Sequence, residues 1–111
     1  MSRAQTIDLE RVLQRAVKAL VEAIDPEQII LFGSAARGEF GEDSDLDFMI
    51  VLPDGSEGGG AGSLAWAALG DLGVPKDVFV TTPRRLKRYG DVRWTLEESA
   101  LREGRQLYAR S

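Results

Sequence analysis

The sequence predicts a small α/β (α+β) fold, in which a mixed β-sheet carries helices mainly on one face. Helix-like and strand-like hydrophobic patterns alternate along the chain. The longest apolar run, Phe48–Leu52, has a strand's length and falls well short of the ~18 residues of a membrane helix. With 111 residues, 43% of them hydrophobic, the chain is long enough for one core, so we expect residues 1–111 to form a single domain.

The first elements follow from hydrophobic spacing and from the residues that end it. Residues 6–24 repeat apolar side chains at the i, i+3, i+4, i+7 spacing of an amphipathic helix, with Thr6 as the expected N-cap. Asp25-Pro26 ends that helix, because proline cannot continue the hydrogen-bond pattern. Residues 28–32 are then expected to form a short buried strand that ends at Gly33.

The middle of the chain combines turns with the most apolar strand. Residues 34–37 are long enough for one helical turn, and residues 38–44 are expected to form a loop. Residues 45–52 predict a central strand, because their second half is continuously apolar. Residues 53–63 contain five glycines and are expected to form a flexible connection.

The next two elements complete a three-stranded core sheet. Residues 64–72 place small and apolar side chains on one side of a short helix, and residues 76–81 predict the third strand. Three strands with helices mainly on one side leave the other face at least partly open. We expect a functional site on that open face.

The C-terminal part predicts two helices and a short edge strand. Thr82 is an N-cap residue before a proline, which opens a basic helix over residues 83–89. Residues 92–103 predict the last helix, which Gly104 ends as its C′ residue. Residues 105–109 are expected to add the edge strand.

The composition excludes several classes of chemistry. The chain has no Cys and no His, which excludes disulfide scaffolds, thiolate zinc sites, Cys nucleophiles and Ser-His-Asp triads. Carboxylates with a hard cation such as Mg²⁺ are then the leading catalytic option. The charged N-terminal segment does not resemble a secretory signal, and no membrane span is expected, so we expect a cytoplasmic location.

Charge is distributed unevenly. The formal net charge is -4, but residues 83–111 hold eight basic and four acidic side chains, a local charge of +4. An acidic chain is a poor general nucleic-acid binder, so we expect no direct nucleic-acid partner. The basic segment is either a solvated helix face or an attractor for an acidic or phosphate-bearing partner.

Three aspartates carry the predicted chemistry. Asp45 and Asp47 are two residues apart on a predicted strand, so both carboxylates point to one face of the sheet. Asp77 begins the next strand, and its carboxylate can join the other two if the strands are neighbours. Such a set of three can hold two metal ions.

A phosphate site is expected beside these aspartates. Gly33 and Ser34 lie between a strand and a helical turn, where free backbone N–H groups can receive a phosphate. Ser44 adds a hydroxyl, and Arg37 can bind a phosphate through two parallel hydrogen bonds. Each residue alone has a structural explanation as a cap, a turn or a surface charge. Their combination favours a site.

With these residues in place, the chain resembles the DNA polymerase β-like nucleotidyltransferase superfamily. The run GSAARG…SDLDFMIVL resembles the minimal nucleotidyltransferase (MNT) branch, and the resemblance covers Ile29 through Val80. The closing ALREGRQLY is also similar to the end of MNT domains. The resemblance implies the nucleotidyltransferase fold.

The resemblance also implies an activity and a partner. MNT proteins are typically encoded by a reading frame beside that of a HEPN-domain protein, and many such pairs act as toxin–antitoxin modules. Characterised MNT proteins transfer AMP from ATP to a tyrosine of the HEPN toxin. Asp45, Asp47 and Asp77 would then be catalytic and would bind two Mg²⁺ ions. Gly33, Ser34, Arg37 and Ser44 would bind the ATP substrate, and the chain would act as an antitoxin within a hetero-oligomer.

Two other functions remain open from the sequence. The chain can be a non-catalytic antitoxin that neutralises its partner by direct binding. It can also be a small-molecule nucleotidyltransferase, although similar enzymes carry a further domain that grips the acceptor.

Overall fold

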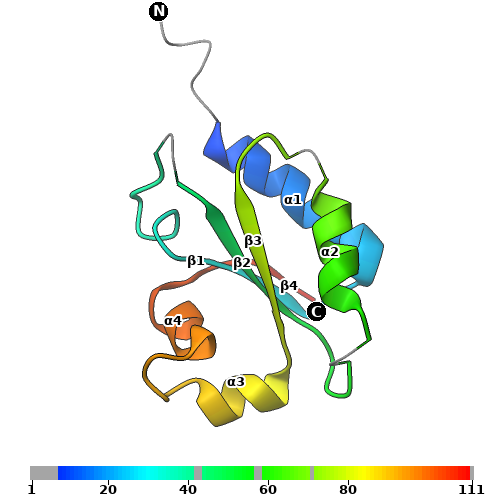
Figure 1. Ribbon diagram of the computed structural model, residues 1–111, viewed down its shortest axis with the longest axis vertical. Helices are drawn as coiled ribbons and strands as arrows, with labels where there is room; N and C mark the ends of the chain where they lie inside the picture. Colours follow the sequence, from blue (N-terminus) through cyan, green and yellow to red (C-terminus); the bar gives the residue numbers. More distant parts are fainter. Residues whose placement is uncertain (1–7, 42–43, 57–58, 71, 111) are drawn as a thin grey trace, which may run out of the picture.

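The computed structural model describes residues 8–41, 44–56, 59–70 and 72–110. Four helices and four strands follow in the order α1 (Leu9–Ile24), β1 (Gln28–Phe32), β2 (Leu46–Val51), α2 (Ala61–Leu69), β3 (Lys76–Thr81), α3 (Pro83–Tyr89), α4 (Leu96–Glu103) and β4 (Arg105–Ala109). The strands form one sheet in the order β3-β2-β1-β4 (Figure 1). β2 pairs with β3 in parallel, whereas β1 pairs antiparallel with both β2 and β4, so the sheet is mixed as predicted.

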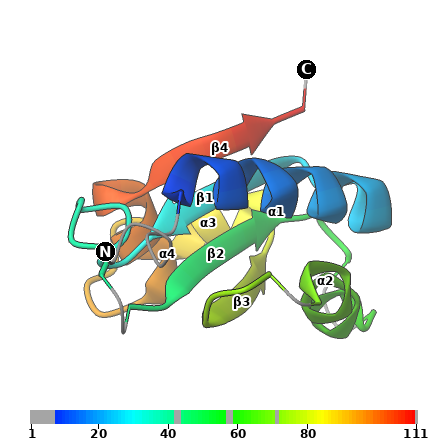
Figure 2. The same ribbon diagram turned by 90° about the horizontal axis from the view of Figure 1, so that it is seen from above.

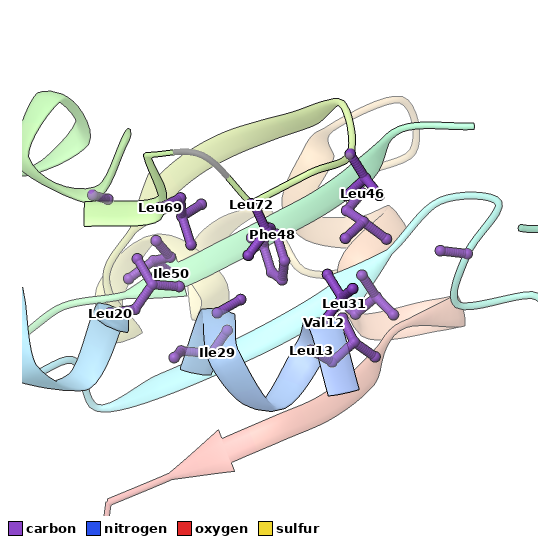
Figure 3. Close-up of a cluster of buried hydrophobic side chains, with 14 of the residues drawn as sticks. Val12, Leu13, Leu20, Ile29, Leu31, Leu46, Phe48, Ile50, Leu69 and Leu72 are labelled. Atoms are coloured by element: carbon purple, nitrogen blue, oxygen red, sulfur yellow. The ribbon is translucent and has the colours of Figure 1, made fainter. Parts of the chain in front are cut away.

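Alternation along β2 separates the two faces of the sheet. Leu46, Phe48 and Ile50 belong to the larger core, which packs between the sheet and the helices α1 and α2 (Figure 3). Met49 and Val51 belong to a smaller cluster on the opposite face, which also contains residues of α3 and α4. Figure 2 shows α1 over the sheet on one side, with α3 and α4 behind it. The longer helices α1 and α2 therefore cover one face, and α3 and α4 cover part of the other.

A buried polar cluster holds α3 and α4 at the end of β3. The Glu97 side chain in α4 accepts hydrogen bonds from the Thr81 hydroxyl (2.9 Å) and from Nε of Arg85 (3.2 Å). Thr81 is fully buried and Glu97 nearly so. Because a buried carboxylate is costly unless it is hydrogen-bonded, these contacts fix how α4 packs against the sheet.

Several predicted boundaries coincide with the observed ones, and others shift. The strands at 28–32, 76–81 and 105–109 and the helix at 83–89 are confirmed. α1 begins at Leu9, because the Asp8 side chain accepts a hydrogen bond from the backbone N–H of Arg11. The expectation of Thr6 as the cap was wrong, and Thr6 itself lies outside the described residues.

The two predicted helices at 64–72 and 92–103 were displaced. α2 occupies Ala61–Leu69, because the helix begins within the glycine-rich connection and ends at Gly70. α4 begins at Leu96, where Thr95 is the N-cap residue, and the preceding residues form turns. The central strand is shorter than the predicted 45–52 by one residue at each end.

Gly104 follows the last residue of α4, so the prediction that it ends this helix is confirmed. Its φ of -77° and ψ of 158° are extended backbone. A Cβ at this position would overlap the Ala100 carbonyl oxygen and Cγ2 of Ile30. Glycine is therefore required by the close approach of α4 to β1 and not by a left-handed conformation. Among the described residues, no helix is long and apolar enough to cross a membrane.

Candidate active site

The sheet register places two of the predicted aspartates side by side. Asp47 in β2 is the direct partner of Asp77 in the parallel neighbour β3. On its other side Asp47 pairs with Phe32, the last residue of β1. Asp45 lies one residue before β2, and Asp45 and Asp77 are both exposed, whereas Asp47 is half-buried. The expected adjacency of the two strands is therefore confirmed. Asp47 lies near the start of β2, on the sheet face that α3 and α4 cover only in part.

Asp45, Asp47 and Asp77, here called the aspartate row, place negative charge around the half-buried Asp47. The pKa of Asp47 is raised above its ordinary value, first by burial and then by the charges of Asp77 and Asp45. Within the described ranges, none of these three carboxylates forms an ion pair. A row of uncompensated negative charge is an environment that favours a bound cation.

Gly33 brings the backbone directly against this row. Its φ is +78°, a left-handed conformation that L side chains rarely adopt. A Cβ built on Gly33 would overlap the Asp47 carboxylate at Oδ2. The chain leaving β1 can therefore pass beside Asp47 only because residue 33 has no side chain.

The segment after Gly33 has the hydrogen bonds of a single helical turn, as predicted, without continuing into a longer helix. Residues 34–38 form successive hydrogen-bonded turns, in which Gly33 O accepts from the N–H groups of Ala36 (3.1 Å) and Arg37 (3.3 Å). In the described part of the chain, no acceptor takes the N–H groups of Ser34 and Ala35. Backbone donors next to the aspartate row are therefore available for a phosphate.

Ser44 and Arg37 have structural partners. The Ser44 hydroxyl accepts a hydrogen bond from Gly41 N–H (3.0 Å) and so closes the loop before β2. The Arg37 guanidinium donates to Glu103 at the end of α4 (3.0 Å) and to Glu39 (3.3 Å). A phosphate would have to compete with these carboxylates for Arg37.

Comparison with known proteins identifies the chain's relatives. Residues 11–108 match the nucleotidyltransferase domain family. The chain belongs to this family. It is 31% identical over 109 residues, covering 86% of this chain and 97% of the relative, to a Methanocaldococcus jannaschii protein named as a candidate protein adenylyltransferase. A structure described as a minimal nucleotidyltransferase matches at a TM-score of 0.58 and 32% identity, over 89% of this chain and 95% of that one.

More distant structures share the fold. A toxin–antitoxin crystal structure with AMP-PNP matches at a TM-score of 0.66 and 22% identity, over 89% of this chain and 74% of that one. A nucleotidyltransferase structure from Sulfolobus solfataricus matches at a TM-score of 0.61 and 19% identity, over 91% and 83% of the two chains. Both support the nucleotidyltransferase fold of the mixed sheet and its helices.

The donor chemistry of this nucleotidyltransferase fits divalent metal, although its side chains are not arranged as a complete ligand set. In the ranges that the structure describes, no three acidic side chains are placed so that they could hold a metal ion. The register nevertheless fixes Asp47 beside Asp77, and the exposed carboxylates of Asp45 and Asp77 have room to rotate. Carboxylate oxygens are the ligands that Mg²⁺ prefers.

The aromatic residues beside the aspartates of this nucleotidyltransferase were not predicted from the sequence. Phe32 and Phe79 lie on the same sheet face as Asp47, with their ring centroids 5.7 Å apart. Phe79 follows Asp77 by two residues, and this period-2 spacing is the signal that could have revealed it. These rings form part of the apolar cluster on the sheet face of Asp47. Burial of Asp47 is the main cause of its raised pKa.

Proposed function

We propose that this nucleotidyltransferase transfers AMP from ATP to the hydroxyl group of a tyrosine of a HEPN-type toxin, and thereby acts as an antitoxin. The observation that carries the proposal is the pairing of Asp47 with Asp77 directly against the Gly33 backbone. The name of the Methanocaldococcus jannaschii relative and the toxin–antitoxin fold neighbour with AMP-PNP support a protein acceptor and an adenine nucleotide. We further propose that residues 1–111 act as one domain in the cytoplasm.

The residues divide into two groups by chemistry. Gly33 and Ser34 would receive the phosphates of ATP through backbone N–H groups and the Ser34 hydroxyl. Asp45, Asp47 and Asp77 would hold two Mg²⁺ ions, which neutralise charge on the triphosphate when bound. Arg37 and Ser44 would assist phosphate binding only if Arg37 leaves Glu103 and Ser44 releases the Gly41 N–H.

The reaction is a displacement at the α-phosphorus. The acceptor hydroxyl oxygen forms a bond to that phosphorus, and the bond from the phosphorus to the bridging oxygen breaks, so pyrophosphate leaves. The proton of the hydroxyl passes to the Asp77 carboxylate, which is exposed at the end of the row and acts as general base. Asp47 is less accessible to an acceptor, because it is half-buried.

Mass spectrometry of the purified toxin tests the proposal. Incubation with the chain, ATP and Mg²⁺ should add one or more adenylyl groups to the toxin, and the Asp45→Asn/Asp47→Asn variant should add none. Glu22→Gln, which removes an exposed carboxylate of α1 on the opposite side of the sheet, is the matched control and should transfer AMP normally. Full transfer by the double variant would rule out the proposed site.

One observation favours a non-catalytic antitoxin as the second candidate. The described acidic side chains do not stand as a complete metal-ligand set, so the site could bind its partner without turnover. A cell protection assay separates the candidates. If the double variant still neutralises the toxin and the toxin's mass is unchanged with the wild type, direct binding is the function.

A further inference from the structure

The turn between α3 and α4 carries the most exposed large apolar side chain of the described residues. The indole of Trp94 is 90% accessible, and Val92 and Leu96 beside it are also exposed. Apolar surface left in water forgoes the stabilisation that burial provides. An exposed apolar cluster with a polar rim is typical of an interaction surface.

The backbone at Trp94 indicates that this exposure is imposed by the fold. Its φ is +76°, which is unfavourable for a bulky residue and persists only where the surroundings hold it. Thr95 anchors the turn, since its hydroxyl lies within hydrogen-bond distance of the carbonyl oxygens of Tyr89 (3.0 Å) and Val92 (2.8 Å). The same hydroxyl accepts from the N–H of Glu98 at the start of α4 (3.1 Å). The exposed indole therefore belongs to a turn that Thr95 connects to the end of α3 and to the start of α4.

The surroundings of Trp94 are positively charged. The Arg93 guanidinium lies over the indole, 5.1 Å from the ring centroid. Four cationic side chains near Trp94 form no ion pair within the described part of the chain. They are Arg93 and, in α3, Arg84, Lys87 and Arg88. The surface therefore complements an acidic partner.

A hollow lies next to the indole. It has a volume of about 420 Å³ and is lined by Arg93, Trp94, Glu98, Ser99 and Arg102. Its one lining carboxylate, Glu98, is neutralised by Arg102 at 2.7 Å. Glu98 therefore does not offset the positive charge around Trp94. The hollow gives a partner side chain room beside the indole.

We propose that the Trp94 surface, formed by Val92, Arg93, Trp94, Leu96 and the adjoining hollow, docks the toxin partner. The partner would supply an apolar pocket for the indole, bordered by carboxylates that face Arg93 and α3. A rigid aromatic anchor loses little conformational entropy on binding, which is why such residues dominate the affinity of many interfaces. The inference rests on the proposed function, because it takes the acceptor to be a partner protein.

This surface is on the same side of the sheet as the candidate active site. Ala100 of α4 and Leu86 of α3 pack in the cluster of the sheet face to which Asp47 belongs. A partner docked on these two helices is therefore on the face where the aspartates are open. Docking and transfer would use separate residues of that face.

The test measures binding of the purified protein encoded by the neighbouring reading frame. Trp94→Asn removes the indole and keeps the turn, because asparagine tolerates a left-handed backbone. We expect its dissociation constant to rise at least tenfold, mainly through faster dissociation. Arg93→Glu should slow association and weaken its salt dependence. Trp66→Asn, at the half-exposed tryptophan of α2, is the matched control and should bind like the wild type.

The outcomes separate docking from catalysis. Equal affinity of the wild type and Trp94→Asn, or no binding of the wild type to that protein, overturns the docking surface. If sedimentation shows a dimer of this chain that Trp94→Asn dissociates, a second copy occupies the surface and the proposal is wrong. If affinity depends on Trp94 but the partner never gains an adenylyl group, the docking surface stands and the proposed transfer fails. A cooperative thermal melt of Trp94→Asn at a Tm close to that of the wild type shows that the variant is folded.

Discussion

The close approach of Gly33 to Asp47 can be tested by substitution, because Gly38 provides a matched control. Both have left-handed backbones, with φ of +78° and +80°, but only Gly33 would place a Cβ against another group, the Asp47 carboxylate. We expect Gly38→Ala to cost only the left-handed strain, about 1–2 kcal/mol. Gly33→Ala should lose more, and it should also lose nucleotide binding because Asp47 is displaced. Thermal melts with and without Mg²⁺-ATP measure both effects; equal behaviour of the two variants would contradict the close approach.

The raised pKa of Asp47 predicts that, without metal, the stability of the fold depends on pH. Its pKa is raised in the folded state by burial and by Asp77 and Asp45, so ionisation of Asp47 opposes folding. This penalty is present above the folded-state pKa and disappears below the unfolded-state value. Asp47→Asn should therefore melt above the wild type at pH 7 in EDTA, and the difference should vanish as the pH falls below about 4.

Asp91→Asn is the control for this titration, because Asp91 is exposed and lies outside the row. It should melt like the wild type over the same pH range. A difference between Asp47→Asn and wild type that grows on acidification would reverse the predicted sign.

At the scale of elements, the contact of α4 with β1 depends on Gly104. A methyl group there would overlap the Ala100 carbonyl oxygen and the Ile30 side chain. We expect Gly104→Ala to destabilise the fold by about 1–3 kcal/mol, the usual cost of overpacking. Gly41→Ala, whose Cβ would meet only the Ser44 hydroxyl oxygen at 3.9 Å, should cost less. Denaturant unfolding of the two variants checks this, and similar losses would contradict the packing argument.

The element boundaries show where sequence patterns are sufficient. β3 and α3 were predicted to the residue, because Thr82 and Pro83 end one and begin the other through local cap chemistry. The start of α4 was missed, because the apolar pattern continues back to Val92 while Trp94 adopts a left-handed φ. That conformation depends on hydrogen bonds from Thr95 to backbone carbonyls and is invisible to hydrophobic periodicity.

At the scale of the whole molecule, ligands should stabilise the fold together. Three carboxylates that form no ion pair with the described residues favour a cation, and Mg²⁺ prefers a site completed by phosphate oxygens. We therefore expect Mg²⁺ with ATP to raise Tm by more than the sum of the two separate increases. The Asp45→Asn/Asp47→Asn variant should lose this rise and should melt above the wild type in EDTA. A wild-type response to Mg²⁺-ATP in that variant would place the metal elsewhere.

The sequence by itself determined the type and order of the helices and strands, because these depend on residues close together in the chain. Period-2 alternation predicts Asp45 and Asp47 on one face; the structure has Asp47 within β2 and Asp45 one residue before it. Only the tertiary structure decided that β3 lies beside β2 in parallel, so that Asp77 meets Asp47, and that Glu103 engages Arg37. It also decided that Trp94 is exposed. These features depend on contacts between residues distant in sequence, where packing and charge, and not local pattern, select the arrangement.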